Sequence, residues 1–146
     1  MNETLPCTAN PCPVTLALVT AARAAETRAE GALAALGLSL AKVNVLRHLV
    51  AERAPIALGE LAERNACVRS NITQLVDRLE ADGLVLRVAD AADRRSVLAE
   101  ATPEGRRRYT AAMRVLDAQE RTLVRELGAT AAGDVLRVLE RVGSAS

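Results

Sequence analysis

Residues 58–85 read LGELAERNACVRSNITQLVDRLEADGLV, and this stretch decides the fold. In its second half, apolar side chains recur at positions i, i+3, i+4 and i+7, which predicts a helix over Arg69–Ala81 with one buried face. These side chains are Ile72, Leu75, Val76 and Leu79. Gly83 follows as the stop. A shorter helix over Leu58–Asn65 precedes it across the short connection Ala66–Val68. Two short helices joined by a tight turn make a helix-turn-helix.

The hydrophobic period changes from helical to strand-like after Gly83. Side chains then alternate along two segments separated by the polar stretch 90–96, and this pattern predicts a β-hairpin. In the first segment, Leu84, Leu86 and Val88 alternate with Val85, Arg87 and Ala89, and in the second the alternating set is Val97, Ala99 and Ala101. A helix-turn-helix followed by a hairpin is a winged helix.

Longer helices flank this unit. The sequence predicts one over residues 14 to about 35, one that begins after Ser39 as its cap, and one that starts at Thr102–Pro103 and runs to about Leu127. After Gly128, a last helix carries an apolar face. The first and last helices are not needed to complete a winged helix, so their apolar faces predict self-association.

The composition excludes several classes of function. The chain has 146 residues, which suits a single core, and 19 basic against 18 acidic residues leave a net charge of +1. It contains one aromatic residue, Tyr109, and one histidine, His48, which disfavours base stacking, zinc sites and histidine-based catalysis. Three cysteines and no apolar run of membrane-spanning length indicate a cytoplasmic chain. We expect no enzyme activity, no cofactor and no metal.

The polar face of the Arg69–Ala81 helix carries side chains suited to reading DNA bases. Asn and Gln form paired hydrogen bonds with adenine, arginine does so with guanine, and Ser and Thr reach phosphates. The candidates for DNA contact are Arg69, Ser70, Asn71, Thr73, Gln74 and Arg78. On an isolated helix such a face would more often be an ordinary solvated surface. Because this helix lies between a tight turn and a hairpin, DNA contact becomes the favoured interpretation of its polar face.

The hairpin tip gives a second candidate contact. Asp93, Arg94 and Arg95 place two guanidinium groups at the end of a two-stranded ribbon. An arginine there fits the narrow minor groove, with Asp93 orienting it, and a charged solvated turn is the alternative. The run Arg106–Arg108 opens the next helix at its end disfavoured for cations, so it is either a phosphate contact or a solvated face.

Taken together, these residues resemble the multiple antibiotic resistance regulator (MarR) family. The resemblance rests on the 58–85 stretch, on Asp93–Arg95 and on Thr102–Gly105, and it extends in order and length over about 14 to 142. It implies a homodimer whose first and last helices interlock. Each subunit would place its second short helix in the major groove and its wing in the minor groove. The resemblance also implies a repressor of pseudo-palindromic operators in double-stranded DNA, released by a small aromatic or lipophilic effector or by an oxidant.

The expected fold class is mainly α with a small β-hairpin wing, a winged helix-turn-helix with N- and C-terminal dimerisation helices. We expect a flexible arm over residues 1–13 that contains proline and cysteine, followed by a single winged-helix domain over 14–146. Within that domain, 14–36 and 103–146 would be dimerisation helices, and 55–102 would be the DNA-binding lobe.

The chain departs from the family pattern just before the second short helix. Val68 stands where relatives usually carry a short polar cap, Ala66 stands at a usual glycine, and Asn65 replaces a usually apolar residue. An apolar side chain cannot accept the first amide hydrogens of a helix. Either the lobe is less stable than usual, or Asn65 supplies the turn geometry, because Asn tolerates left-handed backbone angles.

The cysteines divide into two groups. Cys7 and Cys12 lie in the proline-rich arm and are the redox candidates, although inert thiols are the favoured interpretation because the sequence places no cation near them. Cys67 precedes the second short helix and is expected to pack as a small hydrophobe.

A winged helix that contacts proteins instead of DNA is the rival function, and the near-neutral charge favours it. The salt dependence of binding distinguishes the two functions, because DNA binding weakens steeply with ionic strength and a mixed protein–protein interface responds weakly. If no oxidant acts, the effector is expected between the helical dimer lobe and the winged helix, in a pocket lined by Leu, Val and Ala.

Overall fold

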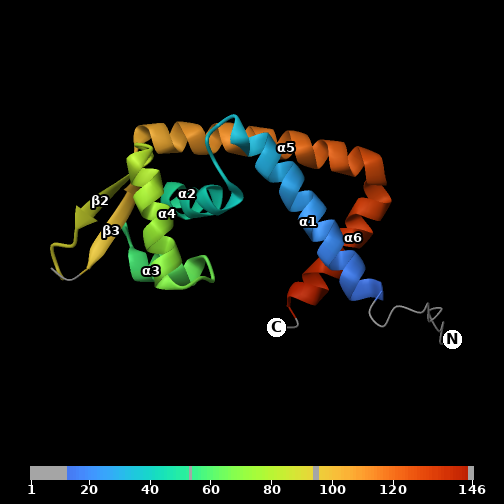
Figure 1. The fold of residues 1–146 in the computed structure, drawn as a ribbon, viewed down its shortest axis with the longest axis horizontal. Coiled ribbons are helices and arrows are strands. Elements are labelled where there is room, and N and C mark those ends of the chain that lie inside the picture. Colours follow the sequence, from blue (N-terminus) through green and yellow to red (C-terminus); the bar gives the residue numbers. More distant parts are fainter. Residues whose placement is uncertain (1–12, 53, 94–95, 145–146) are drawn as a thin grey trace.

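The computed structural model describes residues 13–52, 54–93 and 96–144, and it confirms a mainly helical winged-helix fold (Figure 1). The elements along the chain are α1 (Pro13–Ala34), α2 (Leu40–Ala51), β1 (Ile56–Ala57), α3 (Leu58–Arg64), α4 (Arg69–Ala81), β2 (Val85–Ala89), β3 (Val97–Ala101), α5 (Pro103–Leu127) and α6 (Ala129–Gly143). Each helix that the sequence predicts is present. The redox candidates Cys7 and Cys12 and the wing arginines Arg94 and Arg95 lie outside the described residues.

The core lies where α2, α3 and α4 pack against one another and against the sheet. Its buried hydrophobic side chains fall between Leu33 and Ala112 in the sequence. The helix α4 contributes Ile72, Val76 and Leu79, which are fully buried, whereas Leu75 is half-buried at the edge of the core. The predicted stripe therefore faces inward, as its spacing requires.

The sheet has three antiparallel strands in the order β1-β3-β2, one strand more than the predicted hairpin. The extra strand, β1, pairs Ile56 with Ala99. Two residues are too few for strand alternation to show in a sequence. The structure also settles which side of β2 faces the core: Val85 is buried opposite Ala101, and Leu86 is 51% exposed.

The start of α5 is fastened to the end of α4 through backbone contacts. The hydroxyl of Thr102 accepts from the amide of Gly105 at 2.9 Å, which caps α5, and it donates to the Gly83 carbonyl at 2.8 Å. The Thr102 amide donates to the Leu84 carbonyl at 3.0 Å. A Cβ atom on Gly105 would lie 2.1 Å from that same carbonyl oxygen. Only glycine at this position allows so close an approach.

Two regions of the molecule differ in burial. We call residues 33–112 the winged-helix lobe and residues 13–32 with 113–144 the helical appendage. In the appendage, no side chain that the structure describes is buried. Figure 1 shows α1, the end of α5 and α6 extending away from the lobe. The large apolar side chains left exposed there are Val14, Leu16, Val19, Leu123, Leu127, Val135, Leu136, Val138, Leu139 and Val142. Among the described residues, no helix has both the length and the apolar character needed to cross a membrane.

Candidate nucleic-acid interface

The outer face of α4 exposes nearly all the predicted DNA-contact side chains. Arg69, Ser70, Asn71, Gln74 and Arg78 are exposed. Thr73 is half-buried, and its hydroxyl donates to the Arg69 carbonyl at 2.9 Å. Such a back-bond leaves the oxygen able to accept but occupies its proton. The structure therefore brings the six candidates onto one helix, five of them fully accessible.

Two acidic side chains on the flank of α4 are held by an arginine from the wing. Arg87 of β2 reaches Asp77 at 2.5 Å and Glu80 at 2.7 Å. The hydrogen bond to Asp77 is the main cause of a raised pKa for the Arg87 guanidinium. This pairing joins the hairpin to α4 and offsets one of the two negative charges on its flank.

The sequence analysis did not identify Arg87 as the residue that joins the wing to α4, although a signal was present. Arg87 lies two positions after the buried Val85 on β2, so both side chains point to the same face of the sheet. A charged residue at a core-facing position of a strand indicates a nearby partner of opposite charge.

Two hydrogen bonds in the turn of the wing involve Asp90, Asp93 and Ser96. The carboxylate of Asp90 accepts from the Ala92 amide at 2.8 Å, and the amide of Ser96 donates to the Asp93 carbonyl at 2.9 Å. The side chain of Asp93 is exposed. Its predicted partner, Arg95, and the neighbouring Arg94 lie outside the described residues, so the orienting role of Asp93 stays a prediction.

The turn before α4 rules out one of the two alternatives that the sequence leaves open, a left-handed Asn65. Ala66 has the positive φ, 49°, whereas Asn65 has φ −94°. A left-handed conformation costs a residue with a Cβ roughly 1–2 kcal/mol, so this turn is strained where relatives usually carry glycine. Val68 gives α4 no side-chain cap, as predicted. Both departures therefore fall directly before the face that would meet DNA.

Asn65 contributes through its side chain instead of its backbone. Its Nδ2 donates to the Leu61 carbonyl at 2.7 Å, at the end of α3, and its Oδ1 accepts from Asn44 Nδ2 of α2 at 2.8 Å. Both asparagines are half-buried. Cys67, next in the turn, packs against the core, as expected from the sequence.

The basic run at the start of α5 is used inside the molecule. Arg106 donates to the Val50 carbonyl at 3.1 Å, and Arg108 donates to the Leu36 carbonyl at 2.6 Å. Glu104 accepts from Arg107 at 2.6 Å and from Arg108 at 3.1 Å, and these contacts lower the pKa of its carboxyl group. Two of the three arginines thus join α5 to the segment after α1 and to the end of α2, a role that the sequence analysis did not expect, while a phosphate contact by the exposed Arg107 stays a prediction.

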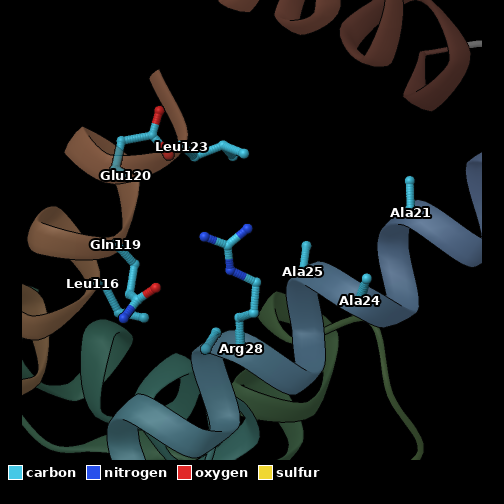
Figure 2. Close-up of a pocket in the computed structure, with 9 residues that line it drawn as sticks. Ala21, Ala24, Ala25, Arg28, Leu116, Gln119, Glu120 and Leu123 are labelled. Carbon is cyan, nitrogen blue, oxygen red and sulfur yellow. The ribbon is translucent and has the colours of Figure 1, made fainter. Parts of the chain in front are cut away.

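Two hollows lie beside α5. One, of about 470 Å³, lies against α2 and is lined by Leu40, Ala41, Val43, Asn44, Arg47, Met113 and Leu116. The other, of about 420 Å³, lies between α1 and α5 and is lined mainly by alanine and leucine side chains. Figure 2 shows Arg28 projecting from α1 into this second hollow, and the guanidinium pairs with Glu126 at 3.3 Å. The first hollow lies at the junction where the sequence analysis expects an effector.

These features define a winged-helix protein with an exposed recognition-type helix. Residues 36–96 match the family model described as the MarR family. The chain is similar to that family over this segment, which holds α2, the two short helices and the first strand of the wing.

A curated relative and two solved structures show how far the similarity extends. The Bacillus subtilis (strain 168) protein YkoM, an uncharacterized HTH-type transcriptional regulator, is 37% identical over 58 residues, 40% of this chain and 38% of that protein. The match thus spans about two fifths of the relative's length.

The transcriptional regulator BldR from Sulfolobus solfataricus is 29% identical, with a TM-score of 0.75 over 91% of this chain and 94% of that chain. The transcriptional repressor CouR of Rhodococcus jostii RHA1, solved bound to a 23-mer DNA duplex, is 26% identical, with a TM-score of 0.82 over 89% of this chain and 92% of that chain.

Proposed function

We propose that this protein is a homodimeric transcriptional regulator that binds an inverted repeat in double-stranded DNA. The observation that carries the proposal is the α4 face, where hydrogen-bonding side chains are exposed and the flanking carboxylates are paired with Arg87 of the wing. Asn71 and Gln74 would read adenine edges, and Arg69 and Arg78 would contact guanine or phosphate. Relatives support this direction, since CouR was solved on a DNA duplex.

The homodimer is supported by the exposed apolar side chains of the helical appendage. In α6, Leu136 is 58% exposed and Leu139 is 47% exposed, on a helix without buried residues. Apolar faces of this extent are rarely left exposed to water. A second copy of the chain presents the same apolar face, so a homodimer would cover both. Two-fold symmetry would then place the two α4 helices about 10 base pairs apart.

We propose repression with release by an effector as the mode of regulation. CouR is named a transcriptional repressor and was also solved with p-coumaroyl-CoA. In this chain, the hollow between α2 and α5 offers apolar walls with Arg47 and Asn44 as polar anchors. An anionic ligand with an apolar body fits that chemistry. Cys7 and Cys12 remain candidates for an oxidant response.

The test begins with selection of bound duplexes from a random DNA pool, followed by fluorescence anisotropy titration of the selected duplex. We expect an inverted repeat, and affinity that falls steeply between 50 and 200 mM salt, as in other proteins that neutralise several phosphates. No enriched duplex, or a weak response to salt, would favour the rival function in which the winged helix contacts a protein.

Single substitutions then assign the contacts. Asn71→Ala and Arg95→Ala should each weaken binding by about 1–3 kcal/mol, because each removes a groove contact, with the circular dichroism spectrum unchanged. Arg114→Ala removes an exposed arginine from α5 and serves as the matched control. Equal losses in Arg95→Ala and Arg114→Ala, with no loss in Asn71→Ala, would mean that charge alone, and not the α4 face, determines binding.

The effector is tested on the same complex. Peroxide and a panel of aromatic acids are added to the protein–DNA complex, and release is followed by anisotropy. The double variant Cys7→Ser, Cys12→Ser should resist peroxide if the arm thiols sense oxidant. Release by peroxide that persists in this variant rejects the arm thiols.

A further inference from the structure

The asparagine pair between α2 and the turn before α4 has a geometry that the DNA-binding face does not itself explain. Asn44 Nδ2 donates to Asn65 Oδ1 at 2.8 Å, and Asn65 Nδ2 donates to the Leu61 carbonyl at 2.7 Å. The chain of contacts runs from α2 through a single amide group to the last turn of α3. Asn65 is also the residue at which α3 ends, immediately before the strained Ala66.

This turn depends more than usual on side-chain support. Ala66 holds a left-handed backbone angle that a Cβ disfavours, and Val68 provides no cap for α4. Both features weaken the local preference for the observed turn. The Asn65 side chain counteracts them, because its two hydrogen bonds fix the end of α3 relative to α2. The Asn44–Asn65 contact is therefore a side-chain link between α2 and the turn from which α4 leaves, in addition to the backbone hydrogen bonds of that turn.

Asn44 also faces the hollow beside α5. Its neighbours on the wall of that hollow include Ala41, Arg47 and Met113. A single N–H of the Asn44 amide binds Asn65, so a molecule in the hollow that draws or pushes this amide toward α5 competes with Asn65 for the position of the side chain. A carboxylate is a strong competitor, because it accepts hydrogen bonds from Asn44 and Arg47 together.

We propose that the Asn44–Asn65 pair is the positioning contact of the DNA-binding helix, and that it transmits occupancy of the α2–α5 hollow to α4. With the hollow empty, the pair holds the turn and keeps α4 in its DNA-binding orientation. An occupant that engages Asn44 releases Asn65, and the turn relaxes. The proposal rests on the proposed function for its biological meaning, but the contact itself is testable without DNA.

The first experiment measures hydrogen exchange in the DNA-free protein. In Asn44→Ala, amides of residues 66–72 should exchange at least about tenfold faster than in the unsubstituted chain, whereas amides in the middle of α5 should not change. If Asn44→Ala fails to fold, Asn65→Leu removes the same contact with an apolar residue and replaces it in the experiment. Unchanged exchange at 66–72 in a folded variant overturns the proposal.

The second experiment fills the hollow without any ligand. Ala41 is exposed and lines the hollow, and the chain has no tryptophan, so Ala41→Trp introduces both an occupant and a unique fluorophore. We expect Ala41→Trp to weaken binding to the selected duplex by about tenfold and to have at most a twofold effect when Asn44 is already alanine. Ala51→Trp, at an exposed alanine at the other end of α2, is the matched control and should leave affinity unchanged.

The outcomes separate the two proposals. Equal losses from Ala41→Trp with and without Asn44, or the same loss from Ala51→Trp, overturn the transmission through Asn44. If the unsubstituted chain selects no duplex, the proposed function fails, and hydrogen exchange at residues 66–72 in Ala41→Trp then decides the link alone. Faster exchange than in Ala51→Trp supports it, and equal exchange overturns it.

Discussion

The winged-helix lobe and the helical appendage differ in how far they bury their own apolar side chains. In the lobe, buried side chains such as Ile72 and Leu79 satisfy the hydrophobic patterns of their helices against neighbours in the same chain. In the appendage, α6 has an equally regular apolar face and buries none of it. A single chain therefore completes the lobe, whereas the apolar face of the appendage stays uncovered within one chain, and the proposed function assigns its cover to a second copy. The comparison teaches that a hydrophobic stripe on a helix predicts a buried face. It does not predict whether the surface that buries this face belongs to the same chain or to another one.

The largest expected effect comes from placing a charge on the apolar face of α6. Leu139→Asp should abolish dimers at micromolar concentration and weaken DNA binding by about 100-fold or more, because an unpaired carboxylate in an apolar interface costs several kcal/mol. Analytical ultracentrifugation measures the oligomeric state. Gly133→Asp adds the same charge on the opposite side of α6, where nothing lies within 4 Å of an added Cβ, and should leave the dimer intact. A Leu139→Asp dimer would show that α6 is not the interface.

A second prediction makes one chemical change in both regions and expects opposite signs. Gly105→Ala should destabilise the lobe by about 1–3 kcal/mol or more, because the new Cβ meets the Leu84 carbonyl oxygen at 2.1 Å. Gly133→Ala in α6 should instead stabilise by about 0.5–1 kcal/mol, since alanine favours a helix and the site is open. Urea unfolding at fixed protein concentration measures both. A neutral or stabilising effect of Gly105→Ala would contradict the close approach at this glycine.

A third prediction compares helix starts. The hydroxyl groups of Ser39 and Thr102 accept from the amides of Lys42 and Gly105, whereas α4 begins at Val68 without such a bond. Val68→Ser should stabilise the chain by about 1 kcal/mol, the usual contribution of a cap, and Ser39→Ala should cost a similar amount. Thermal unfolding followed by circular dichroism reports both. No gain from Val68→Ser would mean that the turn cannot present the hydroxyl to α4.

The smallest expected effect is a pH dependence at the start of α5. Arg107 and Arg108 lower the pKa of Glu104 below its ordinary value of 4.5. A carboxyl group with a lowered folded-state pKa stabilises the fold above its unfolded pKa, and that contribution is lost as the pH falls through the folded-state value. Glu104→Gln should therefore be less stable than the unsubstituted chain at pH 6, and the difference should shrink as the pH falls below 4.5. A difference that grows toward low pH would reverse the assignment.

The sequence predicted the helical part of the fold because that information is local. The spacing in Arg69–Ala81 defined both the helix and its buried side, and Thr102–Pro103 marked the start of α5. The strand β1 was not predicted, since Ile56 and Ala57 are held only by pairing with β3, far along the chain. The residue type of Asn65 made it one candidate for a left-handed backbone, but the positive φ belongs to Ala66.

The candidate DNA face was predicted more completely than the contacts that hold it in place. The helical spacing of the apolar side chains predicts that Ile72 is buried, and it therefore also predicts that the polar side chains between them are exposed. Arg87, Asn44 and the internal use of Arg106 and Arg108 were missed. Each acts on a partner at least seven positions away in sequence, and no local pattern reports such a partner.

The sequence by itself determined that this protein is a winged helix with apolar flanking helices, because helix period, caps and turn residues act over a few neighbouring positions. Tertiary structure alone decided which arginines stay outside and which bind carbonyl groups, and which side of β2 faces the core. It also decided that α2 touches the turn before α4 through two asparagines. These outcomes depend on distances between segments far apart in the chain, and such distances exist only once the chain has folded.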